Sequence, residues 1–187
     1  MGDRTQEDRI REYATKTVRL GSRLNDTALL RAVIARMTKT FSLLPPDALE
    51  LFLSEARRLY ITVMPDTGFP FGMKTKSEET PEIRRYAITM HKEHMEWSED
   101  LFIGAMLHEL GHVAARRPPE QEWPRGKKER AEFKERLEAR ADALVWKWGL
   151  RHYSMRHLTA TYPEHYVERI VKAIAQTLLE EDLSWNE

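Results

Sequence analysis

Two histidines stand four residues apart in the segment His108-Glu109-Leu110-Gly111-His112, and a glutamate directly follows the first of them. On a helix, residues i and i+4 lie on one face, roughly 6 Å apart. Two imidazole nitrogens at that separation can bind one tetrahedral Zn²⁺. Glu109 is offset by about 100° around the helix, so its carboxylate can reach a metal-bound water rather than the metal. The spacing therefore predicts a zinc site in which Glu109 is the catalytic general base.

The motif requires a helix, and residues 97–117 have the pattern of one. Ser98 is a preferred N-cap residue, and acidic residues at 99 and 100 suit the positive end of the helix dipole. Pro118 and Pro119 prevent the helix from continuing. An apolar stripe at helical spacing consists of Phe102, Met106, Leu110 and Val113. The two histidines fall in the neighbouring stripe, at the margin of the predicted core; the alternative is a pair of ordinary core histidines beside a solvated glutamate.

A catalytic zinc usually has three protein ligands and keeps one position for water. The chain has no cysteine, so thiolate ligands are excluded. Glu138 lies beside the apolar stripe of a predicted helix over 127–148, where an unpaired buried carboxylate would be costly, and a zinc ion would explain it. Asp142, one turn later, is predicted to accept a hydrogen bond from the outer nitrogen of a ligand histidine. The alternative is a solvated helix, and the fallback ligands are Glu122, Glu132 and Glu135.

His108-Glu109-x-x-His112 followed by Glu138-x-x-x-Asp142 resembles the gluzincin pattern of zinc metallopeptidases. Among small members, the chain most resembles the ImmA/IrrE type and other minimal zincin-like domains of bacteria and phages, over roughly residues 60 to 150. The resemblance implies a small twisted sheet over the active-site helix. It also implies one Zn²⁺ bound by the two histidines and Glu138, with Glu109 as general base. Arg140 departs from the pattern, because the ImmA/IrrE signature usually has a second glutamate there.

The patterns in the rest of the chain predict an α+β fold with two to four strands and additional helices at both ends, and the resemblance implies that this fold is zincin-like. Helices are expected over 6–20, 27–40, from Asp47 onward, and over 163–179. Strands are expected over 60–64 and 85–91, with a short third strand within 69–75. We expect one domain over 1–187, comprising an N-terminal helical part (1–58), a catalytic core (59–150) and a C-terminal helical part (151–187).

The strand over 85–91 directly precedes the motif helix. In zincins such a strand often lies at the sheet edge and pairs with extended substrate, so the resemblance predicts that role here. An edge strand offers unpaired N–H and C=O groups to a peptide. An ordinary inner strand is the alternative. The segment 116–130 also has two interpretations, a lid over the site or a solvated connection between the two helices.

The composition gives no indication of a nucleic-acid or membrane partner. Lysine plus arginine and aspartate plus glutamate number 30 each, so no nucleic-acid or membrane partner is expected. No apolar run reaches transmembrane length, and the first eleven residues contain no signal-peptide core. The absence of cysteine is consistent with the predicted cytoplasmic location. The oligomeric state is not predicted.

These patterns together predict a zinc metallopeptidase whose substrate is a protein or peptide. The rival is a non-catalytic binding or regulatory protein of the same fold, with a structural metal or none; a structural zinc would be closed by four protein ligands. A peptidase also needs a donor that stabilises the oxyanion. The candidates after the predicted ligand helix are His152, Tyr153, His157, Tyr162, His165 and Tyr166.

Overall fold

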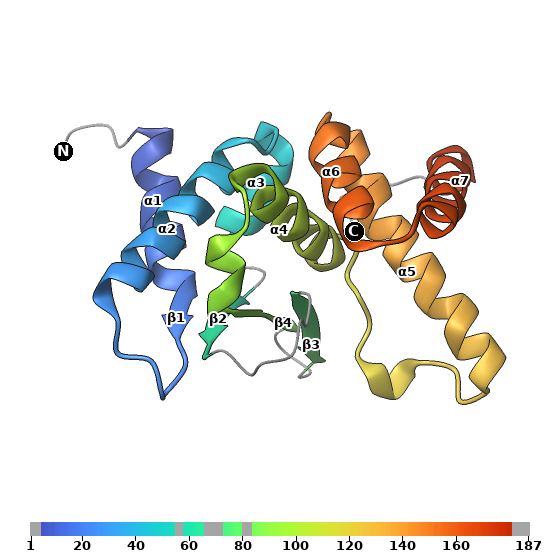
Figure 1. Ribbon diagram of the computed structural model, residues 1–187, viewed down its shortest axis with the longest axis horizontal. Helices are drawn as coiled ribbons and strands as arrows, with labels where there is room; N and C mark the ends of the chain where they lie inside the picture. The colour runs from blue at the N-terminus through green and yellow to red at the C-terminus, as the bar shows by residue number, and fades with distance from the viewer. Residues whose placement is uncertain (1–4, 55–57, 66–72, 80–83, 181–187) are drawn as a thin grey trace.

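The computed structural model describes residues 5–54, 58–65, 73–79 and 84–180, which form seven α-helices and one four-stranded sheet. The predicted α+β class is confirmed. Helices lie along one side of the sheet, and the C-terminal helices extend the molecule beyond it (Figure 1). Buried apolar side chains from both the N-terminal and the C-terminal helices belong to one core cluster.

The N-terminal helices agree largely with the predictions, with one exception at residues 18–20. Helix α1 (Gln6–Thr17) is followed directly by strand β1 (Val18–Leu20), although the sequence predicted helix to residue 20. β1 pairs in parallel with β2, and this long-range pairing overrides the helical pattern. Helix α2 (Thr27–Ser42) begins after the N-cap Asp26, and α3 (Pro46–Leu53) begins one residue before the predicted start.

The sheet has the strand order β1-β2-β4-β3. β2 (Arg58–Met64) pairs in parallel with β4 (Arg84–His91), and β3 (Lys74–Glu79) pairs antiparallel with β4. Strand side chains alternate between faces, and the buried face consists of Leu59, Ile61, Val63, Tyr86, Ile88 and Met90. This face packs beneath the helices.

The predicted edge position of strand 85–91 is wrong, because β4 lies between β2 and β3. The strand at the edge on that side is β3, which also contacts the motif helix. The third strand was predicted within 69–75, and β3 begins at Lys74, near the end of that interval. Residues 66–72, which hold most of the interval, lie outside the described residues.

The motif helix is α4 (Glu99–Ala114), and every residue from Phe102 to Ala114 is buried. It follows a short 3-10 turn, η1 (Lys92–Glu96), and Ser98 is its N-cap, accepting a hydrogen bond from the Leu101 N–H, as predicted. The chain then passes through a second turn, η2 (Glu120–Glu122), into α5 (Lys127–Lys147), α6 (Arg151–Thr161) and α7 (Glu164–Glu180). Both α5 and α6 pack on α4 (Figure 1).

Gly111 permits the close approach of α5 to α4. A Cβ atom at this position would lie 2.5 Å from the carbonyl oxygen of Ala141 and 2.9 Å from its carbonyl carbon. No real side chain tolerates such a distance to backbone, so any other residue at 111 would push α5 away. Ala141 directly precedes Asp142, which means that this contact sets the distance between α4 and the carboxylates of α5.

We therefore expect Gly111→Ala to weaken metal binding as well as the fold. Alanine favours the helix by about 1 kcal/mol, but overpacking typically costs about 1–3 kcal/mol, so the net stability should fall. Phe41→Leu, a core change in α2, serves as a control that lowers stability away from α5. Chemical unfolding and metal titration of both variants provide the measurement. If Gly111→Ala retains the wild-type metal affinity, the contact does not set the site.

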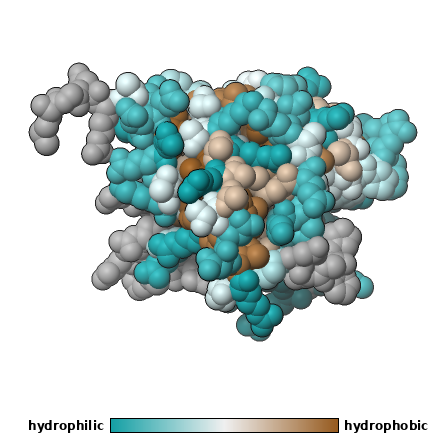
Figure 2. Space-filling view, turned by 60° about the vertical axis from the view of Figure 1, so that its left-hand side comes forward, coloured by the Kyte–Doolittle hydropathy of each residue, from teal (hydrophilic) through white to brown (hydrophobic). Residues whose placement is uncertain are grey.

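Among the described residues, no helix is long and apolar enough to cross a membrane. Figure 2 shows the face that carries the N-terminal helices, where hydrophilic side chains predominate and apolar ones gather mainly in a central strip. Large apolar side chains that are exposed include Met64, Leu178 and Leu179.

Candidate metal centre

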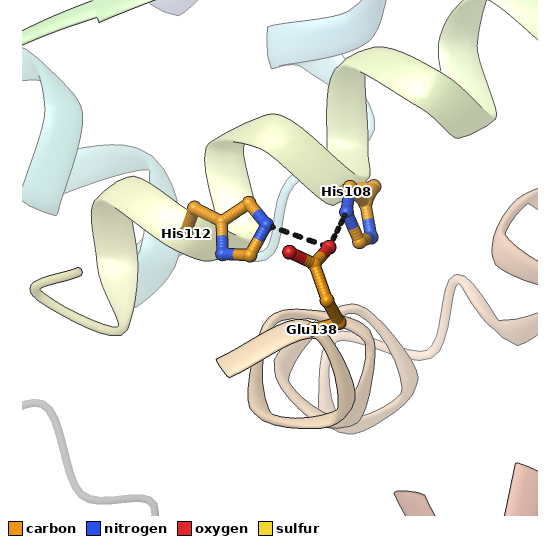
Figure 3. Close-up of side chains that lie close together, drawn as sticks. All are labelled: His108, His112 and Glu138. Carbon is orange, nitrogen blue, oxygen red and sulfur yellow. Dashed lines mark hydrogen bonds and ion pairs between the residues drawn. The ribbon is translucent and has the colours of Figure 1, made fainter. Parts of the chain in front are cut away.

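The side chains of His108, His112 and Glu138 converge between α4 and α5 (Figure 3). One carboxylate oxygen of Glu138, Oε2, lies 3.1 Å from Nε2 of His108 and 3.3 Å from Nε2 of His112. One potential ligand atom from each residue lies within 4.8 Å of the other two. The i,i+4 spacing on α4 places both rings on one face, and α5 supplies the carboxylate opposite them. This group can hold a metal ion.

Charge and burial at the centre favour an ionised Glu138 carboxylate beside a basic His108 imidazole. Burial opposes ionisation of Glu138, but hydrogen bonds and charge from the two histidines hold its pKa well below the usual value. Burial likewise lowers the pKa of His108, but the Asp142 and Glu138 carboxylates outweigh it and hold that pKa well above its usual value. A cation is therefore favoured where these groups meet, whether it is a proton or a metal ion.

The fallback ligands lie away from the centre. Glu122 and Glu132 are exposed, and Glu135 pairs with Arg169 at 3.0 Å. Glu138 alone among the predicted glutamate ligands belongs to the group with the two histidines. The stripe argument placed Glu138 beside the buried side of α5, and its side chain is only 18% exposed, although most residues of the helix before it are exposed.

Asp142 accepts a hydrogen bond from Nδ1 of His108 at 3.0 Å, which is the contact predicted from sequence. Its other oxygen accepts from the Ser154 hydroxyl at 2.8 Å, and Ser154 in turn accepts from the indole N–H of Trp146 at 3.1 Å. An indole nitrogen only donates, so the direction of each bond in this buried chain is defined. The hydroxyl proton points to Asp142, the carboxylate accepts from Nδ1, and Nε2 of His108 faces Glu138.

We expect Asp142→Ala to lower metal affinity by about 10–100-fold, the usual effect of removing a partner that orients a ligand histidine. Ser154→Ala should produce a smaller loss, because the carboxylate stays but one of its two anchors is removed. Metal competition titration of both variants measures the effect. An unchanged affinity in Asp142→Ala would mean that the carboxylate does not orient His108.

Glu109 is buried beside the two histidines, with only 6% of its surface exposed. One of its carboxylate oxygens has no hydrogen-bond partner among the described residues. Its backbone carbonyl accepts a 3.3 Å hydrogen bond from the Thr75 hydroxyl, which ties α4 to β3. A buried carboxylate oxygen without a partner is costly, and an active site is one place where such a cost is retained. This carboxylate adjoins the group formed by His108, His112 and Glu138, which can hold a metal ion.

The segment between α4 and α5 contributes residues that sequence analysis did not identify. Arg117 places Nη1 3.3 Å from Nε2 of His112 and 3.6 Å from Oε1 of Glu138. Its guanidinium carbon also lies 5.0 Å from the centre of the Trp123 ring. Trp123 is buried and donates from its indole N–H to the carbonyl of Pro118 at 3.2 Å. Part of this segment is therefore packed against the site rather than simply solvated, which the mixed Pro, Arg and Glu composition did not indicate.

A cleft of about 700 Å³ opens over the centre. Of the predicted donor candidates, His157, Tyr162 and Tyr166 line it, whereas His152 and His165 are exposed and lie outside its lining. Burial lowers the pKa of His157 to about 4, which keeps its ring neutral at pH 7. Burial also raises the pKa of Tyr162, so its hydroxyl stays protonated. Both side chains are thus available as hydrogen-bond donors near the histidines.

No family model, curated protein or solved structure matches this chain. The donor set is two imidazoles and one carboxylate in an open cleft. In proteins, three such ligands are typical of catalytic zinc sites that keep a position for water, whereas structural zinc usually has four protein ligands.

Proposed function

We propose that the protein is a zinc-dependent peptidase that hydrolyses peptide bonds by direct attack of water. The observation that carries this proposal is the convergence of His108, His112 and Glu138 beside a carboxylate oxygen of Glu109 that has no partner among the described residues. The open cleft above them gives a substrate access. A zincin-like architecture is part of the same proposal.

The residues of the chain would divide the work as follows. His108, His112 and Glu138 would hold one zinc ion, and Asp142 would keep His108 in the tautomer that binds it. A bound zinc supplies Lewis acidity, lowering the pKa of its water toward about 7 and polarising the scissile carbonyl. Glu109 would accept the proton of the attacking water on its carboxylate and deliver it to the leaving amine.

The cleft offers two further features that a peptide substrate needs. β3 runs along one side of it at the sheet edge, where backbone N–H and C=O groups can pair with an extended peptide. On another side, His157 and Tyr162 can donate hydrogen bonds to the oxygen that gains charge in the tetrahedral transition state. The pairing with an extended peptide was predicted for β4, and we now propose it for β3, which lies at the sheet edge.

A non-catalytic binding protein is the second candidate, and the position of Arg117 favours it. Its guanidinium lies within 4 Å of both His112 and Glu138, so a cation of the chain itself already accompanies the carboxylate. In that case the cleft would bind a peptide without cleaving it, and no zinc would be required. The two candidate functions differ in whether a bound peptide is cleaved.

A peptide library with labelled cleavage products tests the proposal. Zinc-loaded protein should produce a reproducible set of cuts, which should disappear after chelation and return when zinc is added back. Cuts that persist in metal-free protein would point to a different hydrolase. If the protein binds peptides from the library and cuts none of them, the binding-protein function is the correct one.

A further inference from the structure

Cationic side chains dominate the rim of the cleft. In the chain as a whole, basic and acidic residues are equal in number, 30 each. Among the described residues that line the cleft, five are basic: Lys74, Lys76, Arg117, Arg130 and Lys134. Apart from the centre's own carboxylates, at 109, 138 and 142, the acidic lining among these residues is Glu120 alone. Outside the centre, the lining of the cleft therefore carries more positive than negative charge, whereas the chain as a whole is balanced.

Two of these cations are held in place by an aromatic ring. The guanidinium carbons of Arg117 and Arg130 lie 5.0 and 5.2 Å from the centre of the Trp123 ring. Trp123 is itself fixed by burial, by its bond to the Pro118 carbonyl, and by an edge-to-face contact with Phe133 at 5.8 Å. Guanidinium groups held this way lose little side-chain entropy when they bind a carboxylate. Each guanidinium also lies 3.6 Å from a carboxylate of the chain, Arg117 from Glu138 and Arg130 from Glu120, so a substrate carboxylate would bind beside these pairs.

The lysines of the lining lie on β3 and on α5. Lys74 and Lys76 are exposed and flank Thr75, whose hydroxyl bonds to the Glu109 carbonyl and so fixes β3 beside the centre. Lys134 is exposed on α5, one helical turn before Glu138. The lining of the cleft thus includes basic residues of β3, of the segment before α5, and of α5.

We propose that this cleft selects peptide segments that carry aspartate or glutamate side chains next to the scissile bond. The inference rests on the proposed peptidase function and names its substrate class. Guanidinium groups pair with carboxylates through two parallel hydrogen bonds, and lysines at the rim attract the same charge over several ångströms. Like-charge repulsion discriminates against basic segments.

Direct binding tests the inference without requiring turnover. The probes are matched fluorescent twelve-residue peptides that differ only in aspartate and glutamate versus asparagine and glutamine, each with a free or an amidated C-terminus. Zinc-loaded Glu109→Gln protein should bind the acidic peptides at least about tenfold more tightly at low salt. The preference should shrink at high salt, because screening weakens contacts between exposed charges. Equal affinity for acidic and neutral peptides would overturn the inference.

Charge reversal locates the selective surface. Lys134→Glu combined with Lys76→Glu should remove most of the preference. The matched control is Lys172→Glu, because Lys172 is exposed on the side of α7 opposite the cleft-lining Ile170, about 200° around the helix. If both proteins lose the preference equally, the rim does not select the substrate. The preference should persist when the C-terminus of the peptide is amidated. If amidation abolishes it, the cleft binds the C-terminal carboxylate of the peptide rather than its side-chain carboxylates.

Binding and cleavage together separate this inference from the proposed function. Wild-type protein that cuts neutral or basic peptides and spares acidic ones would leave the peptidase function intact and refute the substrate class. Wild-type protein that binds acidic peptides selectively but cuts nothing would refute the peptidase function and leave the preference for acidic segments intact.

Discussion

Replacing Glu109 with glutamine is expected to lower peptide hydrolysis by about 10²–10⁴-fold, the usual contribution of a general base. Glutamine keeps the size and shape of the side chain, so a buried residue at this position can be exchanged without a cavity. The amide cannot accept the proton of the attacking water, however. Zinc affinity and thermal stability should stay close to those of the wild type, because Glu109 does not belong to the group that can hold the metal.

Initial rates on the best peptide from the library measure this effect. Glu168→Gln, an exposed position on α7, is the matched control and should cleave at the wild-type rate. A Glu109→Gln protein that retains zinc and cleaves as fast as the wild type would show that another group accepts the proton.

Replacing His112 with alanine should abolish most metal binding. Its Nε2 is one of three potential ligand atoms that lie within 4.8 Å of one another, and two protein ligands hold zinc far less tightly than three. The loss should exceed the 10–100-fold expected when an outer partner such as Asp142 is removed. Metal content after purification and competition with a chromogenic chelator give the two measurements.

Two further variants make the His112 result interpretable. His112 is only 1% exposed, so removing its ring leaves a cavity that could unfold the protein. Glu138→Gln removes a charged ligand while keeping its volume, and it should lose metal in a folded protein. His165→Ala removes an exposed histidine and should lose none. Full zinc retention in both His112→Ala and Glu138→Gln would show that the metal binds elsewhere.

Local patterns predicted the elements that carry the candidate centre. The helical spacing around the two histidines, with Ser98 before it and two prolines after it, predicted the motif helix over 97–117, and the structure has it over Glu99–Ala114. Glu138 and Asp142 were identified because carboxylates beside an apolar stripe require a partner, and both have one in His108. These inferences work because helix periodicity and the cost of burying charge act within one or two turns.

Long-range pairing accounts for what the sequence did not predict. β1 has only three residues, and its parallel partner lies about forty residues away, so no local pattern marks it. Whether β3 or β4 forms the sheet edge depends on strand order, which alternation along a single strand does not encode. Ser154 reaches Asp142 from another helix, and Arg117 reaches the centre from a segment without periodicity. Each depends on tertiary contacts.

Counting the ligands of the bound metal tests the central claim most directly. Crystals of the zinc-loaded protein, with anomalous data collected on both sides of the zinc edge, would locate the ion and its neighbours. We expect one zinc per chain, bound by Nε2 of His108, Nε2 of His112 and the carboxylate of Glu138, with the remaining position occupied by solvent. A zinc closed by four protein ligands, or a centre that stays metal-free in excess zinc with Arg117 against Glu138, would contradict the account.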